Sequence, residues 1–289
     1  MRILLLGGTG MLCHELFQSW KERFDVTVTL REGPEKYSAS KLFSTGNIKY
    51  NVTVENDAGL NALIHEVRPD WVVNCIGIVK QRADAKEAIP SIELNSLFPH
   101  RLAMHCKSAG ANVIQMSTDC IFSGKKGNYS EEDVPDPLDM YGKSKWLGEI
   151  AYPNSITLRT SIIGLELGRA QGLIEWFLAA RGEARGYRRA IYSGFTTMEM
   201  ARILERVFLN HALLGKVWHV ASKPINKFEL LTLLSKMLGR TDLQLVPSDT
   251  FICDRSLCGK LFEEAAQYRA PEWPQMLDEL AQRIKLRNT

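Results

Sequence analysis

The sequence predicts an α/β fold: a doubly wound parallel sheet with helices on both faces, joined to a smaller mixed C-terminal lobe. The chain opens with an apolar run that passes at once into a glycine turn. Short apolar runs then alternate with helix-like patterns, which is typical of a parallel sheet. After Gly164 this alternation loosens. We therefore expect a dinucleotide-binding domain over residues 1–163 and a mainly substrate-binding lobe over residues 164–289, with some crossing of the chain between them.

Composition narrows the class of protein. Of 289 residues, 45% are apolar and 24% are charged, as in ordinary globular proteins. A net charge of +3 is too small to indicate nucleic acid or a membrane surface as a partner. No apolar stretch approaches the roughly 18 residues of a membrane span. The six cysteines show no CxxC pair and no metal-ligand spacing with histidine. We therefore expect reduced thiols, no metal site and a cytoplasmic location.

The chain begins with a predicted strand, a glycine turn and a helix. Arg2–Leu6 is typical of a strand buried on both faces, and Met11–Phe24 has the pattern of an amphipathic helix. Glycines between them let the backbone turn tightly and approach a pyrophosphate at the positive end of the helix. Cys13 stands where a third glycine is usual, and it is small enough for close packing. The expected cofactor contacts of this turn are Gly7, Gly10, Met11 and Leu12.

Arg31 directly follows the second predicted strand, Val26–Leu30. In a dinucleotide-binding fold this position approaches the adenosine ribose. A guanidinium there favours the 2′-phosphate of NADPH, whereas a carboxylate would favour NADH. Arg31 therefore predicts NADPH. A solvated loop arginine, with NADH still accepted, remains the alternative.

Two further strands are expected at Ile48–Thr53 and Trp71–Gly77, with a helix at Gly59–Val67 between them. The second strand ends in Asn-Cys-Ile-Gly, where the backbone would pass close to a ribose. The loop after it lies at the carboxyl edge of the sheet, where ligands of open α/β sheets bind. For the lysine of this loop, the alternative is an ordinary side chain exposed to solvent. The residues singled out here are Cys75 and Gly77 for cofactor and Lys80 for substrate.

A long helix is expected over Ser91–Ala109, followed by strands at Asn112–Ser117 and Ile156–Thr160. Asn95 lies inside this helix, although asparagine is a poor helix former. It is therefore either a structural hydrogen-bonding residue beside the site or simply exposed.

The chemical centre of the sequence is the segment Tyr141-Gly-Lys-Ser-Lys145. Tyr141 and Lys145 are four residues apart, so their side chains share one face of a helix. An ammonium beside a phenol lowers the tyrosine pKa from about 10 toward neutrality, so that the phenol can exchange a proton with a carbonyl or alcohol oxygen. The hydroxyl of Thr118, just after the fifth predicted strand, can hold the same oxygen. The alternative is an ordinary surface helix.

The C-terminal third contains a helix at Gly172–Ala180, a strand at Val217–Val220 and a helix at Lys227–Leu238 that Gly239 would end. A glycine-bearing segment after the first of these helices carries four arginines. They could clamp a diphosphate-bearing substrate, and a solvated loop is an equal alternative. These arginines are Arg181, Arg185, Arg188 and Arg189.

Several motifs together resemble one known family. The segments GGTGML, NCIG, MSTD and YGKSKWLGE are similar to those of extended short-chain dehydrogenases/reductases. The longer stretch STDCIFSGKKGNYSEEDVPDPLDMYGKSKWLGE resembles the dTDP-4-dehydrorhamnose reductase-like nucleotide-sugar reductases, as do LRTSIIG and VWHVAS.

The resemblance implies a Rossmann fold, a nicotinamide cofactor and the roles of individual residues. Tyr141 would be the acid–base, Lys145 its activator and ribose anchor, and Thr118 the hydroxyl that holds the carbonyl oxygen. Cys120 stands where relatives often have tyrosine, and this departure affects how the sugar is gripped. Further expected contacts are Ser117, Tyr141 and Lys145 for cofactor, and Lys80, Asp119, Cys120 and Arg189 for substrate.

We therefore expect an NADPH-dependent reductase of a nucleotide-activated keto-sugar, a 4-keto-6-deoxyhexose in the first instance. Asp119 is followed by Cys120, whereas dehydratases of the superfamily have Asp-Glu after the threonine, so reduction is favoured over dehydration. Two alternatives remain: an NAD-dependent nucleotide-sugar epimerase, and a non-catalytic Rossmann regulatory subunit. Apolar residues on the long helices are compatible with a homodimer.

Overall fold

The computed structural model describes residues 1–79, 86–168 and 171–287 and divides the chain into two compact units. The first unit consists of Met1–Ser117, Asp139–Leu158 and Val207–Val217. The second consists of Thr118–Leu138, Arg159–Arg206 and Trp218–Thr289. The chain therefore passes between the units several times.

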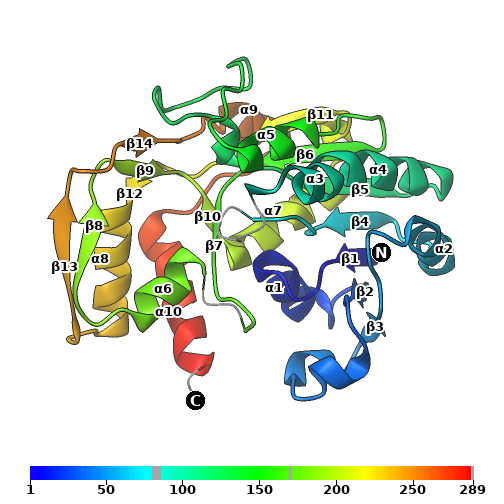
Figure 1. The fold of residues 1–289 in the computed structure, drawn as a ribbon, viewed down its shortest axis with the longest axis horizontal. Helices are drawn as coiled ribbons and strands as arrows, with labels where there is room; N and C mark the ends of the chain where they lie inside the picture. Colours follow the sequence, from blue (N-terminus) through cyan, green and yellow to red (C-terminus); the bar gives the residue numbers. More distant parts are fainter. Residues whose placement is uncertain (80–85, 169–170, 288–289) are drawn as a thin grey trace. The chain divides into compact units, whose positions relative to one another are not determined.

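A seven-stranded sheet carries the first unit, in the order β11-β6-β5-β4-β1-β2-β3 (Figure 1). The pairs from β3 to β6 are all parallel. This confirms the predicted doubly wound α/β fold. The strand expected over Val217–Val220 is β11, and it lies at the edge of this sheet beside β6. The strands are β1 (Arg2–Leu6), β2 (Asp25–Thr29), β3 (Asn47–Lys49), β4 (Trp71–Asn74), β5 (Asn112–Met116), β6 (Ser155–Arg159) and β11 (Lys216–His219).

One face of the sheet packs against helices α2 (Asp57–Val67) and α4 (Phe98–Ser108). Side chains alternate along a strand, so Leu4 and Leu6 of β1 point to the same face. There they join a fully buried apolar cluster, which excludes water from the layer between strands and helices. Its members include Leu4, Leu6, Leu60, Ile64, Val72, Phe98, Leu102, Cys106 and Val113.

The other face packs against α1 (Met11–Trp20) and the end of α7 (Thr197–Leu209). The ring of Phe208 lies 5.2 Å from that of Trp20 and 5.5 Å from that of Trp71 on β4, measured between centroids. Helix α1 is shorter than the predicted Met11–Phe24. Its last residues form a turn, closed by hydrogen bonds to the Trp20 carbonyl, that leads directly into β2.

The predicted helix Ser91–Ala109 is interrupted by a π-helical turn. Helix α3 (Ala88–Ser91) leads into the π-turn Ile92–Leu97, and α4 follows. Pro99 lies in the first turn of α4 and has no N–H, so the carbonyl of Asn95, four residues earlier, cannot receive its α-helical hydrogen bond. A wider turn accommodates this, and such turns are frequent at functional sites.

The second unit contains a two-stranded parallel ribbon, β8 (Gly182–Tyr187) with β13 (Leu243–Ser248). Helix α8 (Lys227–Leu238) packs on this ribbon and α10 (Trp273–Arg287) packs on α8 (Figure 1). Much of the arginine-bearing segment is thus a strand, whose backbone pairs in register with β13, and the alternative of a solvated loop does not hold for residues 182–187. Gly239, at φ +66°, ends α8 as predicted.

The remaining elements of the second unit are short. They comprise the sheet β12 (Ile225–Asn226), β9 (Ala190–Tyr192) and β14 (Cys253–Asp254), the pair β10 (Phe195–Thr196) and β7 (Ile162–Ile163), and helices α6 (Leu173–Ala179) and α9 (Lys260–Ala266). Helix α5 (Met140–Leu147) belongs to the first unit and follows the long excursion of the chain through residues 118–138.

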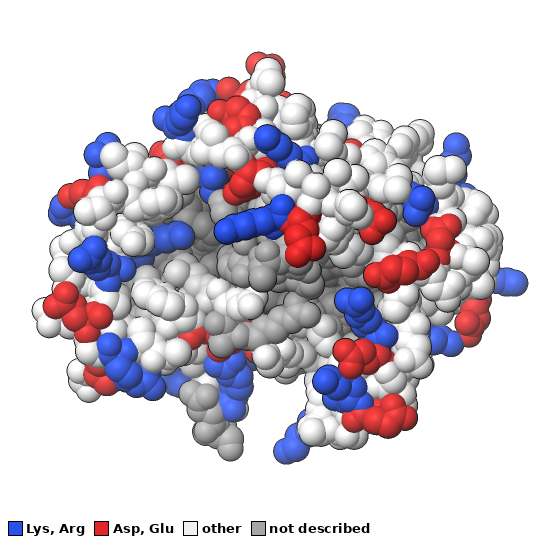
Figure 2. All heavy atoms as spheres, viewed as in Figure 1, with Lys and Arg blue, Asp and Glu red and all other residues white. Residues whose placement is uncertain are grey.

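On the face drawn in Figure 2, basic and acidic side chains alternate with uncharged surface. This agrees with the small net charge of +3. Among the described residues, no helix is both long enough and apolar enough to cross a membrane.

Candidate active site

The glycine turn after β1 brings the chain unusually close to its neighbours. Gly7 has φ +92°, and a Cβ there would lie 3.0 Å from Cγ1 of Ile76. A Cβ on Gly8 would lie 2.8 Å from side-chain carbons of Val28 and Leu30, a constraint that the sequence analysis did not recognise. Gly10 is the N-cap of α1. The structure thus places Gly7, Gly10, Met11 and Leu12 together at a helix N-terminus, a site suited to an anionic diphosphate.

Cys13 fills the position of the third glycine without opening the packing. Its side chain is fully buried, and burial raises the pKa of its thiol well above the ordinary value. The Cys13 thiol is hydrogen-bonded to that of Cys75, just after β4. The Cys75 backbone N–H donates to the carbonyl of Leu6 at 3.2 Å. Two small thiols therefore join α1 to the end of β4.

Arg31 lies at the surface of the first unit, with 68% of its side chain exposed. Its guanidinium is 3.8 Å from the carboxylate of Glu55. A hydrogen bond with its own backbone lowers the pKa of Glu55, and the charge of Arg31 lowers it further. The arginine is accessible to a phosphate, but Glu55 competes for it.

Helix α5 begins at a well-defined cap. The side chain of Asp139 accepts a hydrogen bond from the backbone N–H of Gly142 at 2.9 Å. This fixes the first turn, which contains Tyr141, and places Lys145 one turn later on the same face.

Lys145 is the most informative residue of the first unit. Its side chain is only 8% exposed, and Nζ donates to the carbonyl of Met116 at 2.5 Å. Burial lowers the pKa of Lys145 to about 8, while the charges of Glu149 and Cys75 oppose this shift. A Cβ on Gly77 would lie 4.0 Å from Nζ, so the glycine leaves room beside the ammonium. The predicted residues Cys75, Gly77 and Lys145 thus lie together.

Asn95 connects the end of β4 to α5. It is 1% exposed, and its Oδ1 accepts from the N–H of Ile78 at 2.9 Å. Its Nδ2 donates to the Ile78 carbonyl and to Oγ of Ser144, each at 3.1 Å. Of the two alternatives that the sequence left open, the structural hydrogen bonder is therefore the correct one.

Thr118 begins the second unit and caps a single 3₁₀ turn, Asp119–Ile121. Its Oγ1 accepts from the N–H of Cys120 at 3.1 Å and donates to Oδ1 of Asp119 at 3.2 Å. Burial raises the pKa of Asp119, and the charge of Arg255 opposes that effect. The predicted residues Thr118, Asp119 and Cys120 therefore form one hydrogen-bonded turn.

Arg255 is a neighbour of this turn that sequence reasoning missed. Its Nε donates to the carbonyl of Phe122 at 2.8 Å, and its Nη1 donates to Sγ of Cys120 at 3.5 Å. Cys120 and Arg255 are 135 residues apart in the chain. No local pattern could have connected them.

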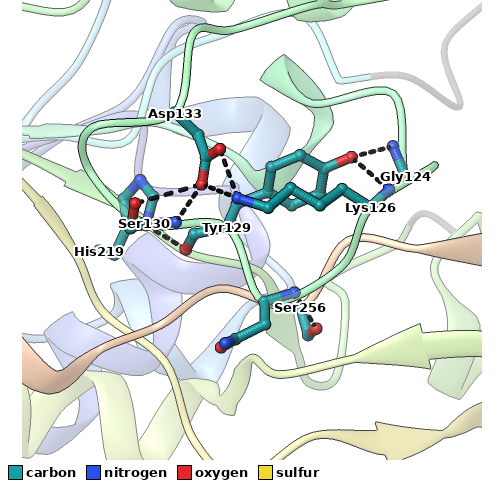
Figure 3. A network of polar contacts seen from close by, with 8 residues as sticks. Gly124, Lys126, Tyr129, Ser130, Asp133, His219 and Ser256 are labelled. Atoms are coloured by element: carbon teal, nitrogen blue, oxygen red, sulfur yellow. Dashed lines mark hydrogen bonds and ion pairs between the residues drawn. The ribbon is translucent and has the colours of Figure 1, made fainter.

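The polar segment Gly124–Pro137, which precedes α5, is internally cross-linked (Figure 3). The hydroxyl of Tyr129 accepts from the N–H groups of Gly124 and Lys126, both at 3.1 Å. The Lys126 ammonium donates to Asp133. A ring nitrogen of His219 lies 2.9 Å from the Tyr129 carbonyl, which ties the loop to β11. The segment is thus a rigid, preorganised part of the second unit.

The predicted arginine clamp is partly occupied by other partners. Arg188 pairs with Asp249 at one end of β8, and Arg181 lies 2.9 Å from Asp242 at the other. Arg189 is exposed. Lys80 lies outside the described residues.

No group of three or more histidine, cysteine or acidic residues that could hold a metal ion occurs over residues 1–79, 86–168 and 171–287.

Comparison with known proteins finds one matching family and several curated relatives. Residues 1–169 match the family described as RmlD substrate binding domain. The chain is 30% identical over 154 residues to methionine adenosyltransferase 2 subunit beta of Mus musculus. This alignment covers 52% of this chain and 42% of that protein. It is 29% identical over 151 residues to dTDP-4-dehydrorhamnose reductase of Streptomyces griseus, covering 52% of this chain and 44% of that protein. The matched regions thus span less than half the length of these relatives.

Solved structures share the fold over nearly the whole chain. The dTDP-4-dehydrorhamnose reductase of Bacillus anthracis, in complex with NADP, superposes with a TM-score of 0.79 at 18% identity, covering 98% of this chain and 99% of that one. The UDP-glucose 4-epimerase of Thermotoga maritima, with UDP-glucose, has a TM-score of 0.82 at 15% identity and full coverage of both chains, 100% each. These neighbours confirm the predicted fold class.

Proposed function

Since the chain belongs to the RmlD substrate binding domain family, we propose that it is an NADPH-dependent reductase of a nucleotide-activated keto-sugar. The observation that carries this proposal is the buried Lys145, one helical turn after Tyr141 and hydrogen-bonded to the end of β5. Burying an ammonium costs free energy of desolvation that its partners rarely repay, so the arrangement points to chemistry.

NADPH, when bound, supplies the hydride that reaches the keto carbon. Tyr141 donates its phenolic proton to the oxygen, so that a C=O becomes a CH–OH. Lys145 stabilises the tyrosinate that remains, and the hydroxyl of Thr118 holds the oxygen in place. The alignment of the two reactants contributes much of the rate.

The residues for the cofactor follow from their places in the first unit. The turn with Gly7, Gly10, Met11 and Leu12 would hold the pyrophosphate at the N-terminus of α1, and Arg31 the 2′-phosphate. The ribose and nicotinamide would lie against the group formed by Cys75, Gly77, Ser117, Tyr141 and Lys145.

For the substrate we propose a nucleotide-linked 4-keto-6-deoxyhexose. The support is the name of the Streptomyces griseus relative and the STD-C-I-F segment that precedes α5. Asp119, Cys120, Arg189 and Lys80 are the proposed contacts. A reaction between NADPH and nucleotide sugars, together with the absence of paired cysteines among the described residues, favours the cytoplasm.

The test is NADPH and NADH oxidation with a panel of nucleotide-linked 4-keto-6-deoxy sugars. We expect turnover with at least one sugar, faster with NADPH, and its loss in Tyr141→Phe. Oxidation that persists unchanged in Tyr141→Phe would overturn the assignment of the proton donor.

A regulatory subunit without catalysis is the second candidate, because several curated relatives are named as a subunit of methionine adenosyltransferase. An NAD-dependent epimerase is the third, because an epimerase shares the fold. A non-catalytic subunit would bind NADPH but would not oxidise it with any sugar of the panel. An epimerase would interconvert sugars without net oxidation of NADPH.

We also propose a homodimer through the exposed apolar side chains of α3, the π-turn, α4 and α5. The support is that six large apolar side chains are exposed on these consecutive elements; Met104 is 69% exposed and Leu147 is 61% exposed. Light scattering should give a dimer for the wild type and a monomer for Met104→Glu. A monomeric wild type would contradict this proposal. The exposed apolar residues are Ile89, Ile92, Leu97, Met104, Trp146 and Leu147.

A further inference from the structure

Lys145 can activate a tyrosine only while it carries its charge, and its surroundings work against that charge. It is nearly enclosed, with 8% of its side chain exposed, and burial is the main cause of its low pKa of about 8. One hydrogen bond, to the carbonyl of Met116, supports the ammonium directly. A lysine with a lowered pKa gives up its proton more easily, so any group that sustains the charge affects catalysis.

The charge of the Glu149 carboxylate acts on this ammonium, and Glu149 stands directly after the last turn of α5. Gly148 ends α5, and a Cβ there would lie 1.8 Å from the carbonyl oxygen of Asn95, so only glycine permits this approach of the chain. The approach directs Glu149 to β5. There Oε1 accepts a hydrogen bond from Oγ of Ser117 at 2.7 Å.

Ser117 is the residue next to Met116. Thus the ammonium is bound by the carbonyl of one residue, and the carboxylate is bound by the hydroxyl of the next. This arrangement fixes both charges at the end of β5. Among the residues that the structure describes, the charges that act on Lys145 are those of Glu149 and of the Cys75 thiol just after β4, and Tyr141 lies one turn earlier on the same helix.

We propose that Glu149 is a positioning residue for the reductase reaction: its carboxylate keeps Lys145 charged and aimed, and Ser117 holds that carboxylate in place. The kinetic part of this inference rests on the proposed function. Its electrostatic part, the charge state of Lys145, does not. Glu149 does not touch substrate; it acts through Lys145.

The experiment compares wild type with Glu149→Gln, which keeps the shape and can still accept from Ser117. The titration of Lys145 is measured by competitive acetylation at a series of pH values, with mass spectrometry of the peptide that contains it. Removing a nearby charge should lower the Lys145 midpoint by about one pH unit. Glu93→Gln is the matched control, because Glu93 is exposed on the π-turn of the same unit. It should leave the midpoint unchanged.

The pH profile of kcat/KM with the active sugar gives the second readout. For Glu149→Gln we expect the alkaline limb to move to lower pH by the same shift, so that activity falls about fivefold near pH 8 and little at pH 6. Glu149→Asp keeps a carboxylate at this position, so its alkaline limb should move less than that of Glu149→Gln. An unchanged Lys145 midpoint in Glu149→Gln, or an equal loss of activity at every pH, would overturn the inference. If no sugar is reduced, the proposed function fails, but the acetylation midpoints still decide the role of Glu149.

Discussion

We propose that Arg31 favours NADPH and that its neighbour Glu55 opposes this preference. Both side chains are more than half exposed, so solvent screens their interaction. We expect Arg31→Ala to weaken NADPH binding about fivefold, the equivalent of roughly 1 kcal/mol, and to leave NADH binding unchanged. Glu55→Gln should strengthen NADPH binding slightly, because it removes the competing carboxylate. Fluorescence titration of both cofactors measures each effect. Equal weakening of NADPH and NADH by Arg31→Ala would argue against a contact with the 2′-phosphate.

Lys145 illustrates the conflict between stability and function at a single residue. Its folded pKa of about 8 lies below the unfolded value of 10.5, so burial of the charge opposes folding at neutral pH. We expect Lys145→Met to raise the free energy of unfolding by about 2 kcal/mol and to abolish NADPH oxidation. Urea denaturation at pH 7 measures the first effect. A clear loss of stability in Lys145→Met would mean that the ammonium is part of the structural framework.

At the scale of elements, the cross-linked loop before α5 depends on the hydroxyl of Tyr129. The side chain is 4% exposed, and its ring is stacked on Phe122 with centroids 4.2 Å apart. Tyr129→Phe keeps this stacking but leaves the N–H groups of Gly124 and Lys126 without their acceptor, at a cost of about 1–3 kcal/mol.

The matched control is Tyr152→Phe, because Tyr152 is 42% exposed and its hydroxyl lies 2.8 Å from Nδ1 of the half-buried His100. Thermal unfolding should show a drop for Tyr129→Phe and little change for Tyr152→Phe. Equal behaviour of the two variants would mean that water replaces the lost acceptor in the loop.

The elements also show what the sequence could and could not predict. The strands of the large sheet and the helices α2 and α8 follow from local periodicity, so their existence was predicted and their ends moved by a few residues. The π-turn was missed because its cause is a missing N–H at Pro99 together with the distant partners of Asn95. The strand β8 was missed because its pairing with β13 connects Gly182 to Leu243, and its own sequence has no strand-like alternation.

The residues of the candidate site show the same difference between contiguous motifs, which the sequence could predict, and long-range contacts, which it could not. The glycine turn and the Tyr141–Lys145 pair are contiguous motifs, and periodicity alone puts them on a strand end and a helix face. Asn95 was noticed but not assigned, whereas Glu149 and Arg255 were not recognised. The side chain of Glu149 binds 32 residues away and that of Arg255 binds 135 residues away. Contacts of that range depend on tertiary structure, which local patterns do not encode.

For the whole molecule, His219 should make stability depend on pH. It is fully buried, and burial, reinforced by the charge of Arg159, lowers its pKa from 6.5 to about 4. The unfolded chain therefore takes up a proton at a pH where the folded protein does not. Stability is full above pH 6.5 and is lost progressively as the pH falls toward 4, by about 3 kcal/mol in total.

Urea denaturation between pH 7.5 and pH 4 would measure this loss against His219→Gln. The variant should be less stable at pH 7.5, because the hydrogen bonds to Tyr129 and Arg159 change, but its stability should depend less on pH. The same slope in both proteins would assign the pH dependence to other groups.

The central claim is that this fold transfers a hydride to a sugar ketone while Tyr141 supplies the proton. The most direct measurement uses NADPH deuterated at the transferring position of nicotinamide C4, incubated with the active nucleotide keto-sugar and analysed by mass spectrometry. We expect one deuterium on the new carbinol carbon for each NADPH oxidised, and none with Tyr141→Phe. Binding of NADPH without deuterium transfer to any sugar, or interconversion of sugars without oxidation of NADPH, would rule out this reaction.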